Sequence, residues 1–270
     1  MGVINVTPDS FSDGGKFYNT DVAVAQGEKL AAEGADIIDV GGESTRPFSD
    51  PVPVEEEIRR VVPVIEKLAQ RVSIPISIDT TKADVARRAL EAGAAIINDV
   101  AALRSEPALA ALAVEFDTPL ILMHMLGEPK SMQVSPRYEN LIEDIRSFLT
   151  DAVERAVKLG VSRSKIIVDP GIGFGKTVTH NLLLLKHVQT FTSLDLPILI
   201  GASRKAFIRK ILKPAHEEDI RPDLPIVETG TQAAVAAAVL NGAHIVRVHN
   251  VGNTVATVKI LDALKNAEEG

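Results

Sequence analysis

Eight short apolar runs are the feature that most restricts what this 270-residue chain can fold into. They are rich in valine, isoleucine and leucine, and longer segments with helical spacing of apolar residues separate them. The runs are Val3–Val6, Asp36–Val40, Pro75–Asp79, Ala95–Asp99, Pro119–His124, Lys165–Asp169, Pro197–Gly201 and Ala243–His249. Continuous apolar runs of this kind are typical of parallel strands that are buried on both faces. The pattern therefore predicts a parallel sheet covered by helices.

The segments between these runs are amphipathic or rich in alanine, and several of them end at a glycine that can cap a helix. They include Asp21–Gly34, Val54–Arg71, Lys82–Gly93, Glu106–Phe116, Glu139–Gly160 and Glu228–Gly242. No low-complexity linker interrupts the alternation, so residues 1–270 are predicted to form a single domain. Eight βα units in about 250 residues predict an α/β fold of the (β/α)8 TIM-barrel type. An open doubly wound sheet is the weaker alternative, because no G-x-G-x-x-G loop follows Val6.

Composition and charge exclude several classes of protein. The net charge of −7 argues against a protein that binds the nucleic-acid backbone, and the absence of cysteine excludes disulfides, thiolate metal sites and thiol nucleophiles. The apolar run Ala233–Leu240 is far shorter than the roughly 20 residues that a membrane helix needs. No charged region precedes an apolar stretch at the N-terminus, so no secretory signal is predicted and the cytoplasm is the expected location.

Nearly every predicted strand ends in a polar or charged residue. In a barrel, the carboxyl ends of the strands form one mouth, where active sites lie. The sequence therefore predicts that these side chains converge there. They are Asn5, Asp39, Asp79, Asn98, His124, Asp169, Ser203 with Lys205, and Arg247 with His249.

Two aspartates and an asparagine stand out among these strand ends. Asp79, Asn98 and Asp169 each follow an otherwise apolar run. Carboxylates at a barrel mouth can accept paired hydrogen bonds from the N–H edge of a heterocycle, which suggests a flat, nitrogen-rich ligand. The alternative is that each aspartate caps the helix or loop that follows it, as Asp79 and Asp99 could do.

A glycine-rich loop and a basic segment follow two later strands. Asp169–Lys176 contains three glycines, which allow the backbone to approach a ligand closely or simply to turn tightly. Gly201–Lys205 brings a hydroxyl and two cations to the mouth, where Lys205 could donate to a carbonyl or an anion. The alternative for this second segment is a solvated helix start. We favour a binding role, because cations at a helix N-terminus are electrostatically unfavourable.

The last strand carries Arg247 and His249 at alternate positions, so both side chains should point to the same side. With Asn5 from the neighbouring first strand, they are predicted to form an anion site. His124 is predicted to be a buried, hydrogen-bonded histidine and Met123 to belong to an apolar wall. Metal-ligand spacing is absent from the sequence, so a divalent ion would arrive with a substrate such as a polyphosphate.

Two further segments are polar and rich in glycine and proline, and we expect them to act as lids over the mouth. They are residues 7–19, after the first strand, and residues 41–53, after the second.

The chain resembles the dihydropteroate synthase family in the order and spacing of eight motifs, from residue 2 to about residue 265. These are Asn5–Gly15, Gly41–Pro47, Ser77–Thr80, Ile97–Asp99, Leu122–Met125, Asp169–Lys176, Ser203–Lys205 and Arg247–His249. The first two motifs together are highly specific. The chain departs from the family pattern at Phe48–Asp50, where a glycine is common, and at Asn250, where an aspartate is common. It also begins at its first strand, whereas family members usually have a short extension before it.

The resemblance implies a barrel enzyme of folate synthesis that joins 6-hydroxymethyl-7,8-dihydropterin diphosphate to 4-aminobenzoate and releases diphosphate. It implies magnesium as cofactor, sulfonamides as inhibitors, small-molecule partners only, and a homodimer. The implied pterin residues are Asp79, Asn98, Met123, Asp169 and Lys205, and the implied diphosphate residues are Asn5, Arg247 and His249. The implied 4-aminobenzoate residues are Phe11, Thr45, Arg46, Pro47, Phe174 and Ser203, and the implied magnesium ligands are Asn5 and Asp13. Lys205, Asp13, Arg247 and His249 would take part in catalysis, without a protein nucleophile.

Two other functions are compatible with parts of this pattern. A pterin-binding methyltransferase that works with a corrinoid partner would share the barrel and the pterin carboxylates but should lack the diphosphate cluster. A barrel that binds pterin without catalysis would have lost some of the polar positions. The presence of Asn5, Arg247 and His249 together with both lid motifs favours the synthase.

Overall fold

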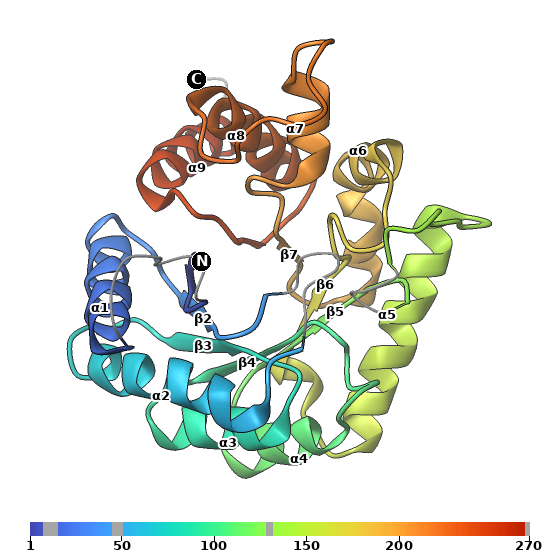
Figure 1. The fold of residues 1–270 in the computed structure, drawn as a ribbon. Helices are drawn as coiled ribbons and strands as arrows, with labels where there is room; N and C mark the ends of the chain where they lie inside the picture. The colour runs from blue at the N-terminus through green and yellow to red at the C-terminus, as the bar shows by residue number, and fades with distance from the viewer. Residues whose placement is uncertain (8–15, 45–50, 128–131, 268–270) are drawn as a thin grey trace.

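Strands and helices alternate along the chain in the computed structural model, which describes residues 1–7, 16–44, 51–127 and 132–267 (Figure 1). The strands are β1 (Gly2–Asn5), β2 (Ile38–Gly41), β3 (Ile76–Asp79), β4 (Ile96–Asp99), β5 (Leu120–Met123), β6 (Ile166–Asp169), β7 (Leu199–Ile200) and β8 (Ile245–Val246). The α-helices are α1 (Lys16–Ala32), α2 (Val54–Ala69), α3 (Ala83–Glu91), α4 (Ala108–Glu115), α5 (Leu141–Lys158), α6 (Val178–Lys186), α7 (Ala206–Leu212), α8 (Pro225–Leu240) and α9 (Val251–Lys265). Two 3-10 helices, η2 (Arg163–Lys165) and η3 (Val188–Leu194), precede β6 and β7.

All eight predicted strands are present, and they pair in parallel. Strands β1 to β6 form one ladder in sequence order, and β7 pairs with β8. Parallel bridges between Gly2 and Val248 and between Val168 and Ile198 join the two ladders at both ends. The strands therefore close on themselves with the helices around them, which confirms the predicted (β/α)8 fold (Figure 1). Strands β7 and β8 are only two residues long, shorter than the runs that predict them.

The strands carry two different layers of apolar side chains. Ile38, Val40 and Ile78 belong to the large core between the strands and the surrounding helices. A separate cluster, which we call the barrel plug, has members from β4, β5 and β7 on the opposite side of the strands. The plug consists of Met1, Ile96, Ile121 and Leu199, with Ile37, Ile167 and Ile245 packed against it. Side chains two residues apart on a strand share a face, so the side chain two positions after a plug residue points into the barrel mouth.

The predicted glycine caps are confirmed at four helices. Gly34, Gly93, Gly160 and Gly242 follow α1, α3, α5 and α8 with φ of 96°, 110°, 99° and 103°, a conformation that favours glycine. Helices α6, α7 and α9 lie outside the six segments named above. In α6 four successive leucines hide the helical period, and its start is set instead by Thr177, whose side chain accepts from the His180 N–H.

Within the described residues, no helix is long and apolar enough to cross a membrane.

We expect Phe191→Ala to lower the free energy of unfolding by about 3–5 kcal/mol. Phe191 lies in η3 and is completely buried in the core between helices and strands, so its removal leaves a cavity. Denaturant unfolding measures the effect, and Leu182→Ala, at a side chain that is 46% exposed, is the matched control. A loss below about 1 kcal/mol at Phe191 would show that η3 does not help to hold the core.

Candidate active site

The guanidinium of Arg247 lies between two carboxylates at the barrel mouth. Its Nε donates to Oδ2 of Asp39 at 2.6 Å, and its Nη2 donates to Oδ2 of Asp79 at 2.7 Å. Asp39 is completely buried, and both of its carboxylate oxygens also accept from Nδ2 of Asn98, at 3.3 and 3.5 Å. The end of the last strand is thereby tied to β2, β3 and β4. Asp79 does not cap the following helix, because the N-cap residue of α3 is Lys82 and no side chain caps that helix.

Burial and neighbouring charges control the ionisation of this group. Burial raises the pKa of Asp79 to about 7; Arg247 opposes this rise, whereas Asp39 and Glu57 add to it. Burial alone would lower the pKa of Arg247, but Asp39 and Asp79 outweigh it and raise that pKa above its ordinary value. Arg247 therefore stays charged, while the Asp79 carboxyl changes charge near neutral pH.

Asp169 and Lys205 form a second charged group at the mouth. Asp169 is buried, and its Oδ1 accepts from the Gly171 N–H at 2.7 Å. Burial raises the pKa of Asp169 to about 6 and lowers the pKa of Lys205 to about 8. The Lys205 ammonium lies 4.0 Å from the centre of the Phe174 ring, within the range of a cation–π interaction.

The glycine-rich loop between β6 and α6 packs directly on its neighbours. Gly171 has a φ of +72°, and a Cβ there would overlap the backbone oxygen of His124. Gly173 has a φ of +84°, its N–H donates to Oδ1 of Asn181 at 2.7 Å, and a Cβ there would lie 3.0 Å from Cδ of Lys205. Both positions require glycine, so the loop's shape follows from close approach as well as from backbone conformation.

An apolar wall stands beside these charges. Met123 and Phe174 belong to a buried cluster with Val100, Met125 and Met132. His124, next to Met123, is 4% exposed, and its Nδ1 contacts Nζ of Lys176 at 2.9 Å. Burial, followed by the nearby Lys176, lowers the pKa of His124 to about 2, so the ring is neutral. The predicted buried, hydrogen-bonded histidine is confirmed.

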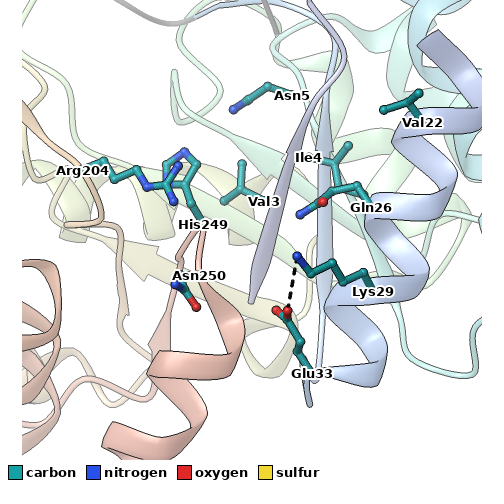
Figure 2. A pocket seen from close by; sticks show the side chains of 10 residues that line it. All are labelled: Val3, Ile4, Asn5, Val22, Gln26, Lys29, Glu33, Arg204, His249 and Asn250. Carbon is teal, nitrogen blue, oxygen red and sulfur yellow. Dashed lines mark ion pairs between the residues drawn. The ribbon is translucent and has the colours of Figure 1, made fainter. Parts of the chain in front are cut away.

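Asn5 and His249 line one cavity of about 420 Å³, together with Arg204 and Asn250 (Figure 2). The His249 ring contacts Oγ of Ser203 at 3.0 Å through Nδ1. Arg247 does not line this cavity, because its guanidinium faces Asp39 and Asp79. Both Arg247 and His249 follow the end of β8, and they have different partners.

The structure therefore gathers most of the predicted residues at the mouth, in two groups. Asp79, Asn98, Met123, Asp169, Phe174, Lys205 and Arg247 surround the charged centre, whereas Asn5, Ser203 and His249 meet near the cavity. Phe11, Asp13, Thr45, Arg46 and Pro47 lie outside the described residues.

The sequence predicts that Asp39 lies at the mouth but gives no specific role to this buried residue or to the buried Lys176. A charged residue between two isoleucine or valine neighbours in a strand was the available signal for Asp39, and the end of the glycine-rich loop was the signal for Lys176.

The described residues contain no group of three or more His, Cys, Asp or Glu side chains that could hold a metal ion. Of the two predicted magnesium ligands, Asn5 is described, and its side chain lines the cavity (Figure 2). An amide oxygen suits magnesium, which usually keeps several waters and substrate phosphate oxygens in its coordination shell. Asn5 therefore fits a magnesium ion whose other ligands are mainly phosphate oxygens of the substrate and water.

Comparison with known proteins gives concordant matches. The sequence profile of a family described as "Pterin binding enzyme" matches residues 1–249. A dihydropteroate synthase of Synechocystis sp. is 45% identical over 98% of this chain and 89% of its own length, and one of Escherichia coli K12 is 42% identical over 100% and 92%. A solved structure of Xanthomonas albilineans dihydropteroate synthase with 4-aminobenzoic acid superposes with a TM-score of 0.90, at 41% identity over 99% of this chain and 93% of that one.

We expect Asp39→Asn to lower the free energy of unfolding of the ligand-free protein by about 3 kcal/mol. The amide would leave the half-buried Arg247 with one carboxylate and would place an N–H₂ group beside its guanidinium. Denaturant unfolding measures the change, with Asp36→Asn at an exposed position as the control. Equal stability of Asp39→Asn and the wild type would show that the Arg247–Asp39 pair does not stabilise the fold.

Proposed function

The chain belongs to the pterin-binding enzyme family, and we propose that it acts as a dihydropteroate synthase, a transferase of folate biosynthesis. It joins 6-hydroxymethyl-7,8-dihydropterin diphosphate to 4-aminobenzoate and releases diphosphate. The observation that carries this proposal is the group of buried carboxylates beside cations at the barrel mouth. The carboxylates of Asp79 and Asp169 can accept hydrogen bonds from N–H groups of a heterocycle, and Lys205 and Arg247 lie next to them.

The pterin ring fits the charged centre. Its amino and ring N–H groups would donate to Asp79 and Asp169, and Asn98 offers both a donor and an acceptor. Lys205 would donate to the ring carbonyl, and Met123 would pack on the ring face. Ligand N–H donors favour the ionised carboxylates, so binding would overcome the burial that raises the two aspartate pKa values.

4-Aminobenzoate would bind farther out, against Phe174 and Ser203. Lys205 connects the two substrates, because its ammonium lies over the Phe174 ring and it follows Ser203 by two residues in the chain. We also assign Phe11, Thr45, Arg46 and Pro47 to this subsite on the family resemblance alone.

The diphosphate would be held by Asn5, His249 and Arg247. Asn5 and His249 line the solvent-reaching cavity, and Arg247 supplies a fixed positive charge at the edge of the pterin site. We propose magnesium as the accompanying ion, with Asn5 and Asp13 as its protein ligands. When bound, it would neutralise charge on the departing diphosphate.

Catalysis then rests on stabilising the leaving group. The carbon–oxygen bond to the diphosphate breaks and its electron pair stays with the diphosphate, while the aminobenzoate nitrogen bonds to the methylene carbon and loses one proton. His249 and Arg247 stabilise the charge that develops on the diphosphate, and Lys205 orients the pterin. Removal of both substrates from water strengthens each of these interactions.

The direct test supplies both substrates with magnesium and follows diphosphate and dihydropteroate together. The synthase makes both products in equal amounts and needs both substrates. Pterin binding without diphosphate release would identify a non-catalytic barrel, and methyl transfer from methyltetrahydrofolate to a corrinoid would identify the methyltransferase.

We further propose a homodimer that forms through α7, α8 and α9. Large apolar side chains on these adjacent helices are 50–64% exposed: Ile211, Ile226, Leu240, Ile260 and Leu264. Sedimentation equilibrium is expected to give a dimer, and Ile260→Asp combined with Leu264→Asp is expected to weaken it. A wild-type monomer at micromolar concentration would contradict this proposal.

Asp169→Asn is expected to weaken pterin binding by about 2–4 kcal/mol, or roughly 30- to 900-fold, because the amide presents a donor to a buried donor edge. Isothermal titration with 6-hydroxymethylpterin measures the loss. The control is pH: the wild-type affinity should fall as the pH drops below about 6, where Asp169 becomes protonated, and this fall should be smaller in the variant. Unchanged affinity in Asp169→Asn would remove the carboxylate from the pterin site.

Arg247→Ala should weaken binding of the pterin diphosphate about 10- to 100-fold more than binding of the bare hydroxymethylpterin. The reason is that the positive charge of the guanidinium attracts the diphosphate group, and the bare hydroxymethylpterin has no such group. Titration of both ligands against the wild type, Arg247→Ala and the exposed-site control Arg71→Ala measures the difference. Equal losses for the two ligands would place Arg247 with the pterin ring alone.

A further inference from the structure

Lys176 is a buried lysine that the proposed reaction does not use, and burial lowers the pKa of its ammonium to about 7. It ends the glycine-rich loop, is 3% exposed, and has two polar contacts, each at 2.9 Å. Its Nζ donates to Nδ1 of His124 and to the backbone oxygen of Phe174. Lysine is almost never buried to this extent without a specific partner. The cost of burying it calls for an account of what it holds in place.

We infer that Lys176 is a positioning residue, which joins His124 to the glycine-rich loop and thereby fixes where Phe174 and Lys205 stand in the site. The inference rests on the proposed function, because its consequence is the placement of the pterin-binding ammonium.

His124 provides a fixed point for this bond. Its backbone N–H donates to the backbone oxygen of Asp169 at 2.8 Å, which continues the pairing of β5 with β6. Its ring packs edge-on against Phe148, with 4.7 Å between ring centres. A protonated Lys176 can only donate to Nδ1, and the proton of the neutral ring is then on Nε2. The ring is thus held on both sides and accepts from one defined atom.

The loop side of the bond leads directly to Lys205. Lys176 holds the Phe174 carbonyl, and the Phe174 N–H donates to the Gly171 oxygen at 3.1 Å. The Phe174 ring lies 4.0 Å from the Lys205 ammonium, and Gly173 lies against the aliphatic part of Lys205. A shift of the loop would therefore move the ring and the backbone that border Lys205 on two sides.

Charge supports the same role. Among the residues that the structure describes, three buried or half-buried carboxylates lie at the mouth, and Lys176 joins two other cations near them. The carboxylates are Asp39, Asp79 and Asp169, and the cations are Lys176, Lys205 and Arg247. Lys176 favours the ionised form of Asp169, so loss of its charge should raise the pKa of that carboxyl.

Other titratable and charged groups surround Lys176 and Asp169. They contribute to any pH dependence, so each variant is compared with the wild type over the same pH range. These groups are His124, Arg104, Tyr138, His180, Lys205, Asp79 and Arg247.

Two pairs of variants test the inference. Lys176→Met removes the donors and the charge but keeps an unbranched apolar chain, and Lys186→Met removes an exposed lysine of α6 as the control. His124→Leu removes the acceptor, whereas His124→Asn keeps an oxygen near the place of Nδ1. We expect Lys176→Met and His124→Leu to weaken pterin binding at least tenfold, and His124→Asn and Lys186→Met to stay within threefold of the wild type. The acid limb of pterin binding should also move to higher pH in Lys176→Met.

A fluorescence measurement reports on the loop without any ligand. The chain has no tryptophan, so Phe174→Trp introduces a single reporter at the end of the loop. We expect acrylamide to quench this tryptophan at least twice as strongly when Lys176→Met is added. Addition of Lys186→Met instead should leave the quenching constant unchanged.

The outcomes separate the two proposals. Wild-type pterin affinity, an unmoved acid limb and an equally shielded tryptophan in Lys176→Met would overturn the positioning role. If Lys176→Met does not fold, equal pterin affinity of His124→Leu and His124→Asn would overturn it instead. If the wild type binds no pterin and releases no diphosphate, the proposed function fails, and the quenching comparison still decides whether Lys176 holds the loop.

Discussion

The two-residue repeat of a parallel strand is the constraint on which this site depends. Along each strand one side chain faces the helices and the next faces the barrel interior. Ile37, just before β2, and Asp39 on β2 are therefore stacked on the same inner face, as are Ile96 and Asn98 on β4 and Ile167 and Asp169 on β6. The lower member of each pair joins the apolar plug, and the upper member enters the mouth. A shift of one residue in β2 or β6 would place a carboxylate among the helices.

Burial of so many charged groups is tolerable only because they are arranged in contact. Arg247 has a carboxylate on each side, and Asp169 accepts from the backbone of the loop that it precedes. The two Arg247 bonds join segments that are far apart in sequence, so they also hold the last strand against the second and third. The same contacts leave donors and acceptors directed at the mouth, where a heterocycle can use them.

The sequence allowed the barrel, the polar mouth and several individual residues to be predicted, because those features depend on local pattern. The strand ends, the helix-closing glycines and the buried His124 are examples. The partners of Arg247 could not be predicted, since they lie 208 and 168 residues away and strand periodicity says only which face a side chain takes. Helix α6 lacked a readable period because four leucines follow one another. The role of Lys176 depends on how a loop folds over the neighbouring strand, which no spacing encodes.

The contrast between the enclosed charges and the open cavity has a consequence for ionic strength. Mobile ions screen charges that face water, but they screen buried pairs much less. The contact between Arg247 and the buried Asp39 belongs to the second kind, whereas the cavity at Asn5 and His249 reaches the surface beside the 65% exposed Lys29 side chain. Added salt should therefore compete with an anionic group held in the cavity and leave recognition of an uncharged ring at the mouth almost unchanged. For one substrate that spans both places, added salt would weaken the binding of its charged end much more than the binding of its ring.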